Sequence, residues 1–382
     1  MHNRFFRKIE QLNDYYVRVW EEVCNIESPT SFKQGVDAVN DYFIKMALER
    51  GFEVEVFEQK VSGNVVRITM NPTAKGKPIS ISGHVDTVHP VGLFGTPAVR
   101  IEGDKIYGPG VEDCKGGVVA GFLAMDALRD EGYTERPIHL FLQSDEEVGS
   151  RFSKKETIRF ICERAYGSEA FINLEGSKAG TACLIRKGIL SVIFNVKGRE
   201  AHSAKCATEG ANAILEAAYK IAEIEKIKDE KGVTCCCSMI NGGTAANTVP
   251  AQCSFTVNVR FANQEQYEWI YSYLEGIAEK THVDGCSCSL ERLSERYAME
   301  YCDRNIELLE KINAALIKSD LPTLKMEGSL GGSDAADVTV YGIPCVDSLG
   351  VRGGKIHTPD EFSFVDSLSE AAKRLVSIIY YL

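Results

Sequence analysis

Two adjacent carboxylates, Glu146 and Glu147, follow an apolar run that ends at Leu142. The run predicts a buried strand over 138–143. A carboxylate that is buried without a partner costs several kcal/mol, so this pair needs compensation at the mouth of such a strand. A bound metal ion or a role in proton transfer would supply it. For this segment alone, a solvated acidic turn is the alternative interpretation.

His84 and Asp86 form a second candidate pair, at the end of the apolar run 79–84. Residues two apart on a strand share one face of the sheet. A metal-bound imidazole is usually held through its other ring nitrogen by a carboxylate or a carbonyl, and Asp86 is placed to hold His84 in this way. A core histidine paired with a structural aspartate is the alternative.

Three further segments carry residues of the same kinds. Asp113 lies in a glycine-rich turn whose glycines let the backbone approach a site, although a helix N-cap is the alternative for this residue. Glu175 follows a strand-like run, and His357 lies in a turn near the C-terminus. Two histidines and several carboxylates, without a thiolate, suit zinc, with manganese or cobalt as substitutes.

The elements that must position these residues alternate between strands and helices. Continuous apolar strands that alternate with helices predict an α/β sheet covered on both faces, with sites at the carboxyl ends of its strands. His84, Glu146 and Glu175 each fall at such an end. We expect strands at 52–58, 64–70, 79–84, 138–143 and 170–174, and helices at 117–131 and 156–165.

The pattern changes between residues 188 and 293, where the order becomes βαββαβ, which is that of a ferredoxin-like domain. The sequence therefore predicts a discontinuous first domain, 1–186 and 298–382, with a second domain, 187–297, inserted into it. The expected elements of the insert are strands at 188–197, 234–240, 252–261 and 286–292 and helices at 211–227 and 265–280. After the insert we expect a helix at 304–318, a strand at 344–349 and a last helix after 363.

Composition narrows the class of protein. The chain has 382 residues and a net charge of −11, which argues against a nucleic-acid surface. No apolar stretch is long enough to cross a membrane, and the N-terminal pattern is an amphipathic helix rather than a signal peptide. We therefore expect a cytoplasmic protein.

Thirteen cysteines are present, and none are paired at the C-x-x-C spacing of zinc fingers. In a reducing cytosol we expect them to be free thiols that pack as small hydrophobes. A structural metal site among them is the alternative.

Five segments in this order resemble one enzyme family, the dinuclear zinc amidohydrolases and exopeptidases that include carboxypeptidase G, acetylornithine deacetylase, succinyl-diaminopimelate desuccinylase and aminoacylase. The resemblance extends over nearly the whole chain. It implies a catalytic domain with a mixed sheet and flanking helices, the zinc exopeptidase fold, and an inserted lid and dimerisation domain. The segments are GHVDTV at 83–88, GPGVEDCKGG at 108–117, SDEEVGS at 144–150, NLEG at 173–176 and KIHTPDE at 355–361.

The resemblance implies two zinc ions per subunit, with cobalt or manganese as substitutes. Asp113 would bridge them, His84 and Glu175 would complete one site, and Glu147 and His357 would complete the other.

The remaining catalytic roles also come from the resemblance. Glu146 would be the general base, Asp86 would orient His84, and the peptide bond between Asp113 and Cys114 would be cis. Two positions depart from the family pattern, which often has proline where this chain has Gly176 and a second aspartate where it has Cys114. A thiol beside the metals would make activity sensitive to oxidation.

Four residues are expected to bind substrate. His202 matches the lid histidine that stabilises the oxyanion, Asn247 a substrate-binding asparagine, and Arg260 the arginine that grips a substrate carboxylate. Gly332 lies in a turn that would add backbone N–H donors to the same anion. Without the resemblance, Arg260 is a surface residue of a strand and His202 belongs to an N-cap region.

The function implied is hydrolysis of an amide or peptide bond beside a free terminal carboxylate, with release of a C-terminal, glutamate-like amino acid. The alternatives are an N-acyl-amino-acid deacylase (a deacetylase or desuccinylase), a dipeptidase, and a non-catalytic metal-binding scaffold. The substrate would be a small peptide or an N-acyl amino acid. A homodimer through helix 211–227 and the lid strands is expected, in which His202 or Asn247 could reach the partner's site.

Overall fold

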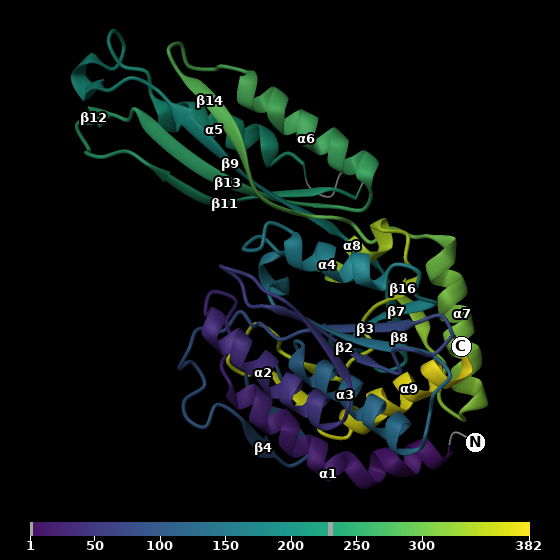
Figure 1. The fold of residues 1–382 in the computed structure, drawn as a ribbon. Helices are drawn as coiled ribbons and strands as arrows, with labels where there is room; N and C mark the ends of the chain where they lie inside the picture. The colour runs from purple at the N-terminus through teal and green to yellow at the C-terminus, as the bar shows by residue number, and fades with distance from the viewer. Residues whose placement is uncertain (1–2, 228–231) are drawn as a thin grey trace. The chain divides into compact units, whose positions relative to one another are not determined.

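The computed structural model describes residues 3–227 and 232–382 and divides them into two compact units (Figure 1). Unit 2 comprises Ile185–Glu300 and Ser329–Gly332, and the rest of the chain forms unit 1. The expected insert, 187–297, lies two to three residues inside the first of these segments. The turn Ser329–Gly332 differs from expectation, because it packs with unit 2 rather than with the catalytic domain.

Unit 1 is built on a six-stranded mixed sheet with the strand order β1-β2-β6-β3-β7-β16. The first two pairs of neighbours are antiparallel, and β6, β3, β7 and β16 run parallel to one another. The strands are β1 (Glu53–Phe57), β2 (Val65–Met70), β3 (Ile79–His84), β6 (Ile138–Gln143), β7 (Ala170–Asn173) and β16 (Cys345–Val346). Because β3, β6 and β7 are parallel neighbours, the residues that follow them meet at one edge of the sheet.

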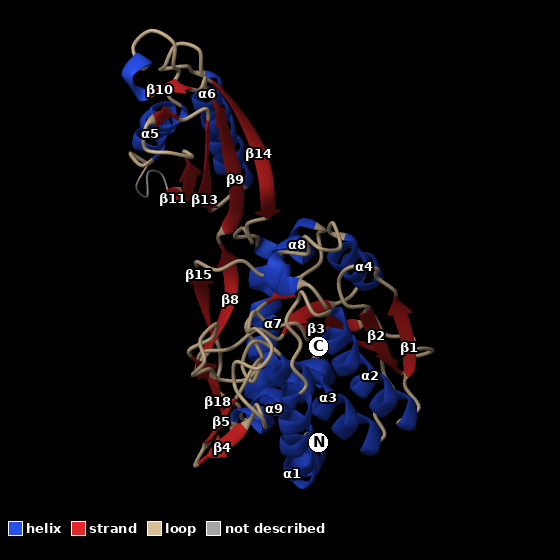
Figure 2. Ribbon diagram, turned by 90° about the vertical axis from the view of Figure 1, so that its left-hand side faces the viewer, coloured by secondary structure: helices blue, strands red, loops and turns tan. Residues whose placement is uncertain are grey.

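Helices cover both faces of this sheet, as Figures 1 and 2 show. On one face α2 and α3 contact the strands, and α1 and α9 pack against α3; on the other face lie α4 and α8, while α7 contacts β16 and α9. Helix α3 is buried on nearly every side, which fits its apolar, glycine-containing sequence. The helices are α1 (Asn3–Asn25), α2 (Lys33–Glu49), α3 (Lys115–Asp130), α4 (Glu156–Ala165), α7 (Asp303–Lys318), α8 (Asp334–Val340) and α9 (Ser367–Tyr381).

One glycine shows how closely α3 approaches the sheet. A Cβ at Gly117 would lie 2.2 Å from the main-chain oxygen of Leu174, so no other residue fits there without moving the end of β7. The start of α3, just after Asp113, is thereby held against the strand that leads to Glu175.

A second sheet in unit 1 joins segments that are distant in sequence. Its order is β17-β18-β5-β4, and it pairs β5 with β18 antiparallel. Asp113 lies in the turn that follows β5, and His357 lies in the loop between β17 and β18. The strands are β4 (Arg100–Glu102), β5 (Lys105–Tyr107), β17 (Gly353–Gly354) and β18 (Phe362–Phe364).

Unit 2 has the βαββαβ order that the sequence predicts, with an antiparallel sheet in the order β11-β13-β9-β14. Helices α5 and α6 pack against this sheet and against each other. Burial alternates along β13, as expected for a sheet with one covered face. The elements are β9 (Gly188–Lys197), α5 (Ala213–Ile224), β11 (Thr234–Gly242), β13 (Gln252–Phe261), α6 (Gln264–Glu279) and β14 (Ser287–Arg296).

The remaining elements are short turns and strands. They are the 3-10 turns η1 (Glu146–Val148) and η2 (Ser203–Lys205) and the strands β8 (Thr181–Arg186), β10 (Ala201–His202), β12 (Thr248–Val249) and β15 (Lys325–Ser329).

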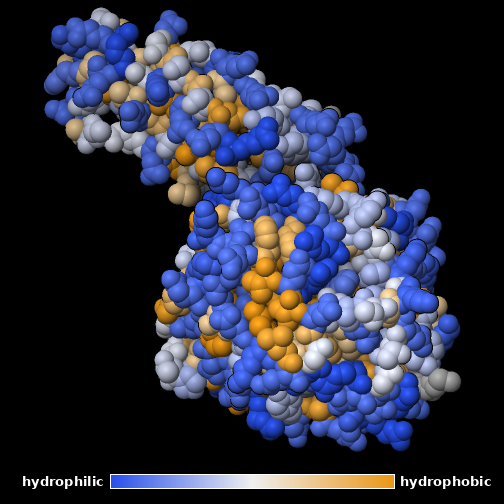
Figure 3. Space-filling view, viewed as in Figure 1, coloured by the Kyte–Doolittle hydropathy of each residue, from blue (hydrophilic) through white to orange (hydrophobic). Residues whose placement is uncertain are grey.

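Most expected elements agree with the structure to within a few residues. The strand expected at 344–349 is shorter, because only Cys345 and Val346 pair with β7. None of the thirteen cysteines, all of which lie within the described residues, forms a disulfide bond. No helix in the described part of the chain combines the length and the apolar character needed to cross a membrane. The visible surface is mostly hydrophilic, with an apolar area on unit 1 (Figure 3).

Candidate metal centre

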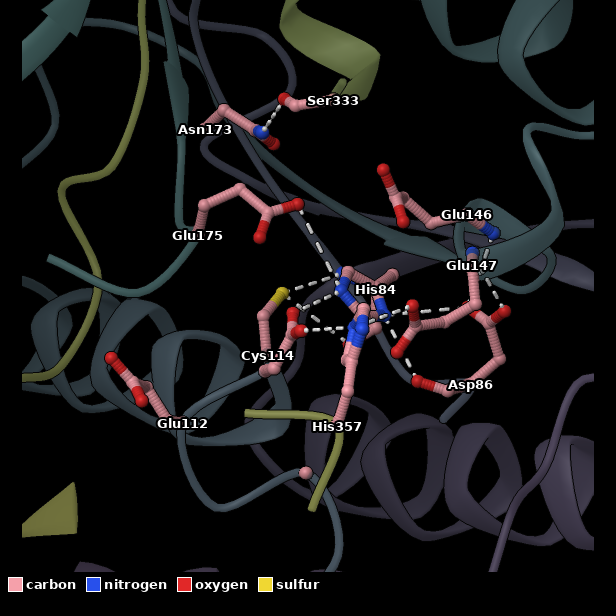
Figure 4. Close-up of polar contacts among 12 residues, drawn as sticks. His84, Asp86, Glu112, Cys114, Glu146, Glu147, Asn173, Glu175, Ser333 and His357 are labelled. Carbon is pink, nitrogen blue, oxygen red and sulfur yellow. Dashed lines mark hydrogen bonds and ion pairs between the residues drawn. The ribbon is translucent and has the colours of Figure 1, made fainter. Parts of the chain in front are cut away.

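Five of the predicted ligands meet at the edge of the unit 1 sheet. His84 ends β3, Glu147 lies in the η1 turn after β6, and Glu175 follows β7. Asp113 and His357 come from the turn after β5 and the loop before β18. The sequence placed His84, Glu175 and Glu146, the neighbour of Glu147, at strand ends, and the structure brings the five ligands together, four of which are labelled in Figure 4.

The side chains are close enough to share cations. His84 Nε2 lies 2.9 Å from Asp113 Oδ1 and 3.8 Å from Glu175 Oε1. On the other side, His357 Nε2 lies 3.1 Å from Asp113 Oδ2 and 3.3 Å from Glu147 Oε2. The two oxygens of Asp113 therefore face the two histidines separately, which is the arrangement that a bridging carboxylate needs.

Asp86 holds this centre in a way that its sequence position did not reveal. His84 Nδ1 donates to the main-chain oxygen of Asp86 at 2.9 Å, and the Asp86 carboxylate lies 3.4 Å from the same nitrogen. The Asp86 carboxylate also accepts the backbone N–H groups of Glu146 and Glu147, both at 3.2 Å, and the hydroxyl of Thr30 at 2.7 Å. One buried aspartate thus orients the histidine and the turn that carries the two glutamates.

Glu146 and Glu147 point in different directions from that turn. The Glu147 carboxylate meets His357, whereas the Glu146 carboxylate is turned away from His357 (Figure 4). Glu146 is buried, with 7% of its surface exposed. The two neighbours are therefore placed for separate tasks.

Glu361, which the sequence analysis did not single out, joins the Asp113 and His357 segments. Its fully buried carboxylate accepts N–H bonds from Gly110, Glu112 and Asp113 at 3.3, 3.0 and 3.1 Å. It also bonds His89 Nε2 at 2.8 Å. Because it lies four residues after His357, it ties both ligand segments to one anchor; its place within the KIHTPDE segment was the available signal.

The surroundings of Gly176 and Cys114, the two positions that depart from the family pattern, are defined in the structure. A Cβ at position 176 would lie 2.7 Å from Glu112 Oε1, so the side chain of Glu112 occupies space that a proline at Gly176 would need. Cys114 is fully buried, and the Asp113–Cys114 peptide bond is cis, as expected.

The charges of the clustered side chains are strongly interdependent. Burial raises the pKa of Glu175, and the nearby charges of Asp113 and Glu146 raise it further. Burial likewise raises the pKa of Glu147, with Asp113 adding to the effect. Hydrogen bonds that His357 donates to Asp113 and Glu147 raise its pKa to about 10. A divalent cation would stabilise the charged form of such crowded carboxylates.

The donor set fits a divalent metal such as zinc. In the groups His84–Asp113–Glu147 and His84–Cys114–Glu175, the ligand atoms lie within 4.8 Å of one another. Nitrogen, oxygen and sulfur donors of these kinds all bind zinc.

The four predicted substrate-binding residues lie in unit 2 and fall into two places. His202 and Asn247 are exposed neighbours at the β10–β12 pair, where the N–H of Ser203 donates to the Asn247 main-chain oxygen at 2.8 Å. Arg260 lies near the other end of β13, about eight residues and roughly 26 Å from the Gln252 end.

Gly332 lies in the same region as Arg260. A Cβ at Gly332 would meet Arg296 Cδ at 2.5 Å and Ile189 Cδ1 at 2.9 Å, and Arg260 and Arg296 both pair with Ile189 in register. Directly paired residues share a face, so two arginines flank Ile189 beside this turn. One of the backbone N–H donors expected in this turn is already used, because the Gly331 N–H donates to Ser329 Oγ at 3.2 Å.

Comparisons with known proteins identify the family of the chain. Residues 80–381 match the model of peptidase family M20/M25/M40. Carboxypeptidase G2 from Pseudomonas sp. (strain RS-16) is 28% identical over 94% of this chain and 86% of its own length. A succinyl-diaminopimelate desuccinylase from Gluconobacter oxydans is 25% identical over 75% of this chain and 77% of its own length.

A solved structure shows the same fold. The aminopeptidase PepT from Bacillus cereus superimposes with a TM-score of 0.77 at 23% identity, over 96% of this chain and 98% of that one. The chain therefore belongs to peptidase family M20/M25/M40, as its segments indicated. It is a metallopeptidase of this metal-dependent family and hence a hydrolase.

Proposed function

We propose that the protein cleaves an amide or peptide bond beside a free terminal carboxylate and releases a C-terminal, glutamate-like amino acid. The observation that carries this proposal is the row of Arg260, Ile189 and Arg296 in unit 2. Burial and the positive charge of Arg296 lower the pKa of Arg260, so the row has a positive potential that suits an anion. Two guanidinium groups suit a substrate with two carboxylates.

The catalytic role proposed for unit 1 follows from its geometry. When bound, two metal ions at the Asp113 cluster supply Lewis acidity and lower the pKa of a water molecule. Glu146 accepts the proton of the attacking water and then delivers it to the leaving amine. The Asp86 carboxylate keeps Glu146 in place by accepting the backbone N–H of Glu146. The metals would be held by two pairs of residues, His84 with Glu175 and Glu147 with His357. His202 donates to the oxyanion that forms on the substrate.

Within one chain, His202 and Arg260 are too far apart to hold the same small substrate. A dipeptide spans roughly 7 Å, whereas β13 separates the two places by roughly 26 Å. We therefore propose that His202 and Asn247 act in the site of a second copy of the chain.

The exposed surface of unit 2 supports a dimer of this kind. The strand β11 lies at the edge of its sheet, and it exposes Met239 and Ile240. Helix α5 exposes Ile214, Leu215 and Tyr219. An open strand edge beside exposed apolar side chains is typical of a protein interface.

The substrate is tested with a panel of N-acyl amino acids and dipeptides that vary at the C-terminal residue, with zinc, cobalt or manganese restored. We expect preference for C-terminal glutamate or aspartate. Preference for N-succinyl or N-acetyl groups, whatever the C-terminal residue, would favour the deacylase alternative. Two bound metals without hydrolysis of any member would favour the scaffold.

The role of Glu146 as the general base and the action of His202 in the partner's site can be tested together. Glu146→Ala should keep its metals and lose roughly 10²- to 10⁴-fold in kcat. If His202 acts in the partner's site, mixing unfolded Glu146→Ala and His202→Ala chains and refolding them should restore about a quarter of wild-type activity, the expectation for random pairing into twofold dimers. A mixture no more active than its parents would contradict the exchange of His202.

A further inference from the structure

The sulfur of Cys114 lies inside the cluster of candidate ligands. Its Sγ and ligand atoms of His84 and Glu175 are all within 4.8 Å of one another. Figure 4 shows the sulfur on the side of His84 that faces the Glu175 carboxylate. A thiol at this place is within bonding reach of a cation that His84 and Glu175 share, since zinc–sulfur bonds are about 2.3 Å long.

The strand β3 fixes the position of this sulfur. A Cβ at Gly83 would lie 2.7 Å from Val118 Cγ2 and 3.2 Å from Cys114 Sγ, so the glycine leaves room for both side chains. The backbone N–H of His84 donates to the sulfur at 3.0 Å. These contacts hold the sulfur at the end of β3, next to the ligand atom of His84.

We propose that Cys114 is a ligand of the metal position formed by His84 and Glu175. The inference rests on the metal-dependent function proposed above, and it adds a ligand that the expected set of five lacks. On coordination the S–H bond breaks, a sulfur–metal bond forms, and the proton passes to solvent. No oxidant or reductant is required.

This ligand makes the two metal positions chemically different. The position of His84, Glu175 and Cys114 has nitrogen, oxygen and sulfur donors, whereas the position of Glu147 and His357 has nitrogen and oxygen only. Thiolate favours zinc, cadmium and cobalt over manganese and magnesium. The first position should therefore retain a soft or borderline ion while the second exchanges.

A structural role for the same thiol makes a different prediction. Cys114 Sγ also lies 3.6 Å from the main-chain oxygen of His84, so it could simply fill space against the strand. A serine would keep both backbone contacts but is a poor ligand for soft ions. Cys114→Ser therefore separates a packing role from coordination.

The test is titration of the metal-free protein with Co²⁺, followed by near-ultraviolet absorption. A sulfur-to-cobalt charge-transfer band should grow with the first equivalent and stop growing with the second. It should be absent in Cys114→Ser and Cys114→Ala and unchanged in Cys206→Ser, which removes an exposed thiol of unit 2. Competition titration should show zinc affinity reduced at least about tenfold in Cys114→Ser, with a smaller change for manganese.

Two results would overturn the proposal. One is a charge-transfer band in Cys114→Ser equal to that of the wild type, which would place the sulfur ligand elsewhere. The other is wild-type protein that binds two cobalt ions without any such band. If the variants fail to fold, X-ray absorption of wild type with one equivalent of zinc decides, through the presence or absence of a zinc–sulfur distance near about 2.3 Å.

These outcomes are separable from failure of the proposed function. Hydrolysis of the substrate panel without sulfur coordination would leave the function intact and reject Cys114 as a ligand. Sulfur coordination without hydrolysis would do the reverse.

Discussion

The candidate residues of unit 1 and those of unit 2 are held in opposite ways. In unit 1, Asp113 and His84 are buried and lie 2.9 Å apart, in a cluster whose turns are fixed by Asp86 and Glu361. In unit 2, His202 and Asn247 are exposed and Arg260 lies near the far end of the sheet. The candidate metal ligands are therefore preorganised within one chain, whereas we propose that the candidate substrate-binding residues need a substrate or a second chain to complete them.

The largest effect should follow from breaking the centre of unit 1 at Asp113. Asp113→Asn removes the charge that faces both His84 and His357, so both metals should be lost and hydrolysis should fall below detection. Metal content by mass spectrometry and the rate on the best panel substrate measure this. Two metals retained at wild-type affinity would show that Asp113 does not bridge.

A change in unit 2 should leave the metals in place. Arg260→Lys keeps a positive charge but loses the forked geometry that binds a carboxylate, so KM should rise about 10- to 100-fold with little change in metal content. Steady-state kinetics with acidic and neutral C-terminal residues measure the effect. An unchanged KM together with a reduced kcat would move Arg260 from substrate binding to another role.

Glu361 tests how far the preorganisation of unit 1 depends on its supporting residues. Glu361→Gln replaces an acceptor of several N–H bonds with a group that is half donor, so metal affinity should fall about 10- to 100-fold. Calorimetric titration of the metal-free protein measures this. Asp360→Asn, at an exposed neighbour that pairs with Lys355, is the matched control and should bind metal as the wild type does.

The last effect concerns the stability of the packed sheet behind the centre and not its activity. Burial, with the charge of Arg67, lowers the pKa of His139 to about 4, below its ordinary value of 6.5. The folded state therefore disfavours the protonated form, so the stability is complete above pH 6.5 and is lost as the pH falls toward 4. The loss is at most about 3 kcal/mol.

Urea unfolding of the metal-free protein at about pH 7.5 and about pH 4.5 checks this expectation. His139→Gln can still bond Thr69 but does not titrate, so its stability should fall less between the two pH values than that of the wild type. Equal losses in both proteins would mean that His139 is not the group responsible.

The sequence determined the elements and much of the metal centre. Apolar runs of strand length end directly at His84 and shortly before Glu146, and parallel strands bring their carboxyl ends to one edge. The proximity of these residues therefore follows from the order of the strands and helices alone. The βαββαβ order of unit 2 was readable for a similar reason, because helix and strand periodicities differ locally.

Only the tertiary structure decided the contacts that depend on chain segments far apart. Glu361 binds the amide of Asp113 from 248 positions away, and no local pattern predicts such a pair. The place of Glu112 in the space beside Gly176 and the separation of Arg260 from His202 are of the same kind. Periodicity specifies which face of an element is buried, but the partners on that face are chosen by packing across the whole fold. The sequence therefore predicted the kinds of ligand in this centre, and the fold decided which sulfur, carboxylate and amide groups surround it.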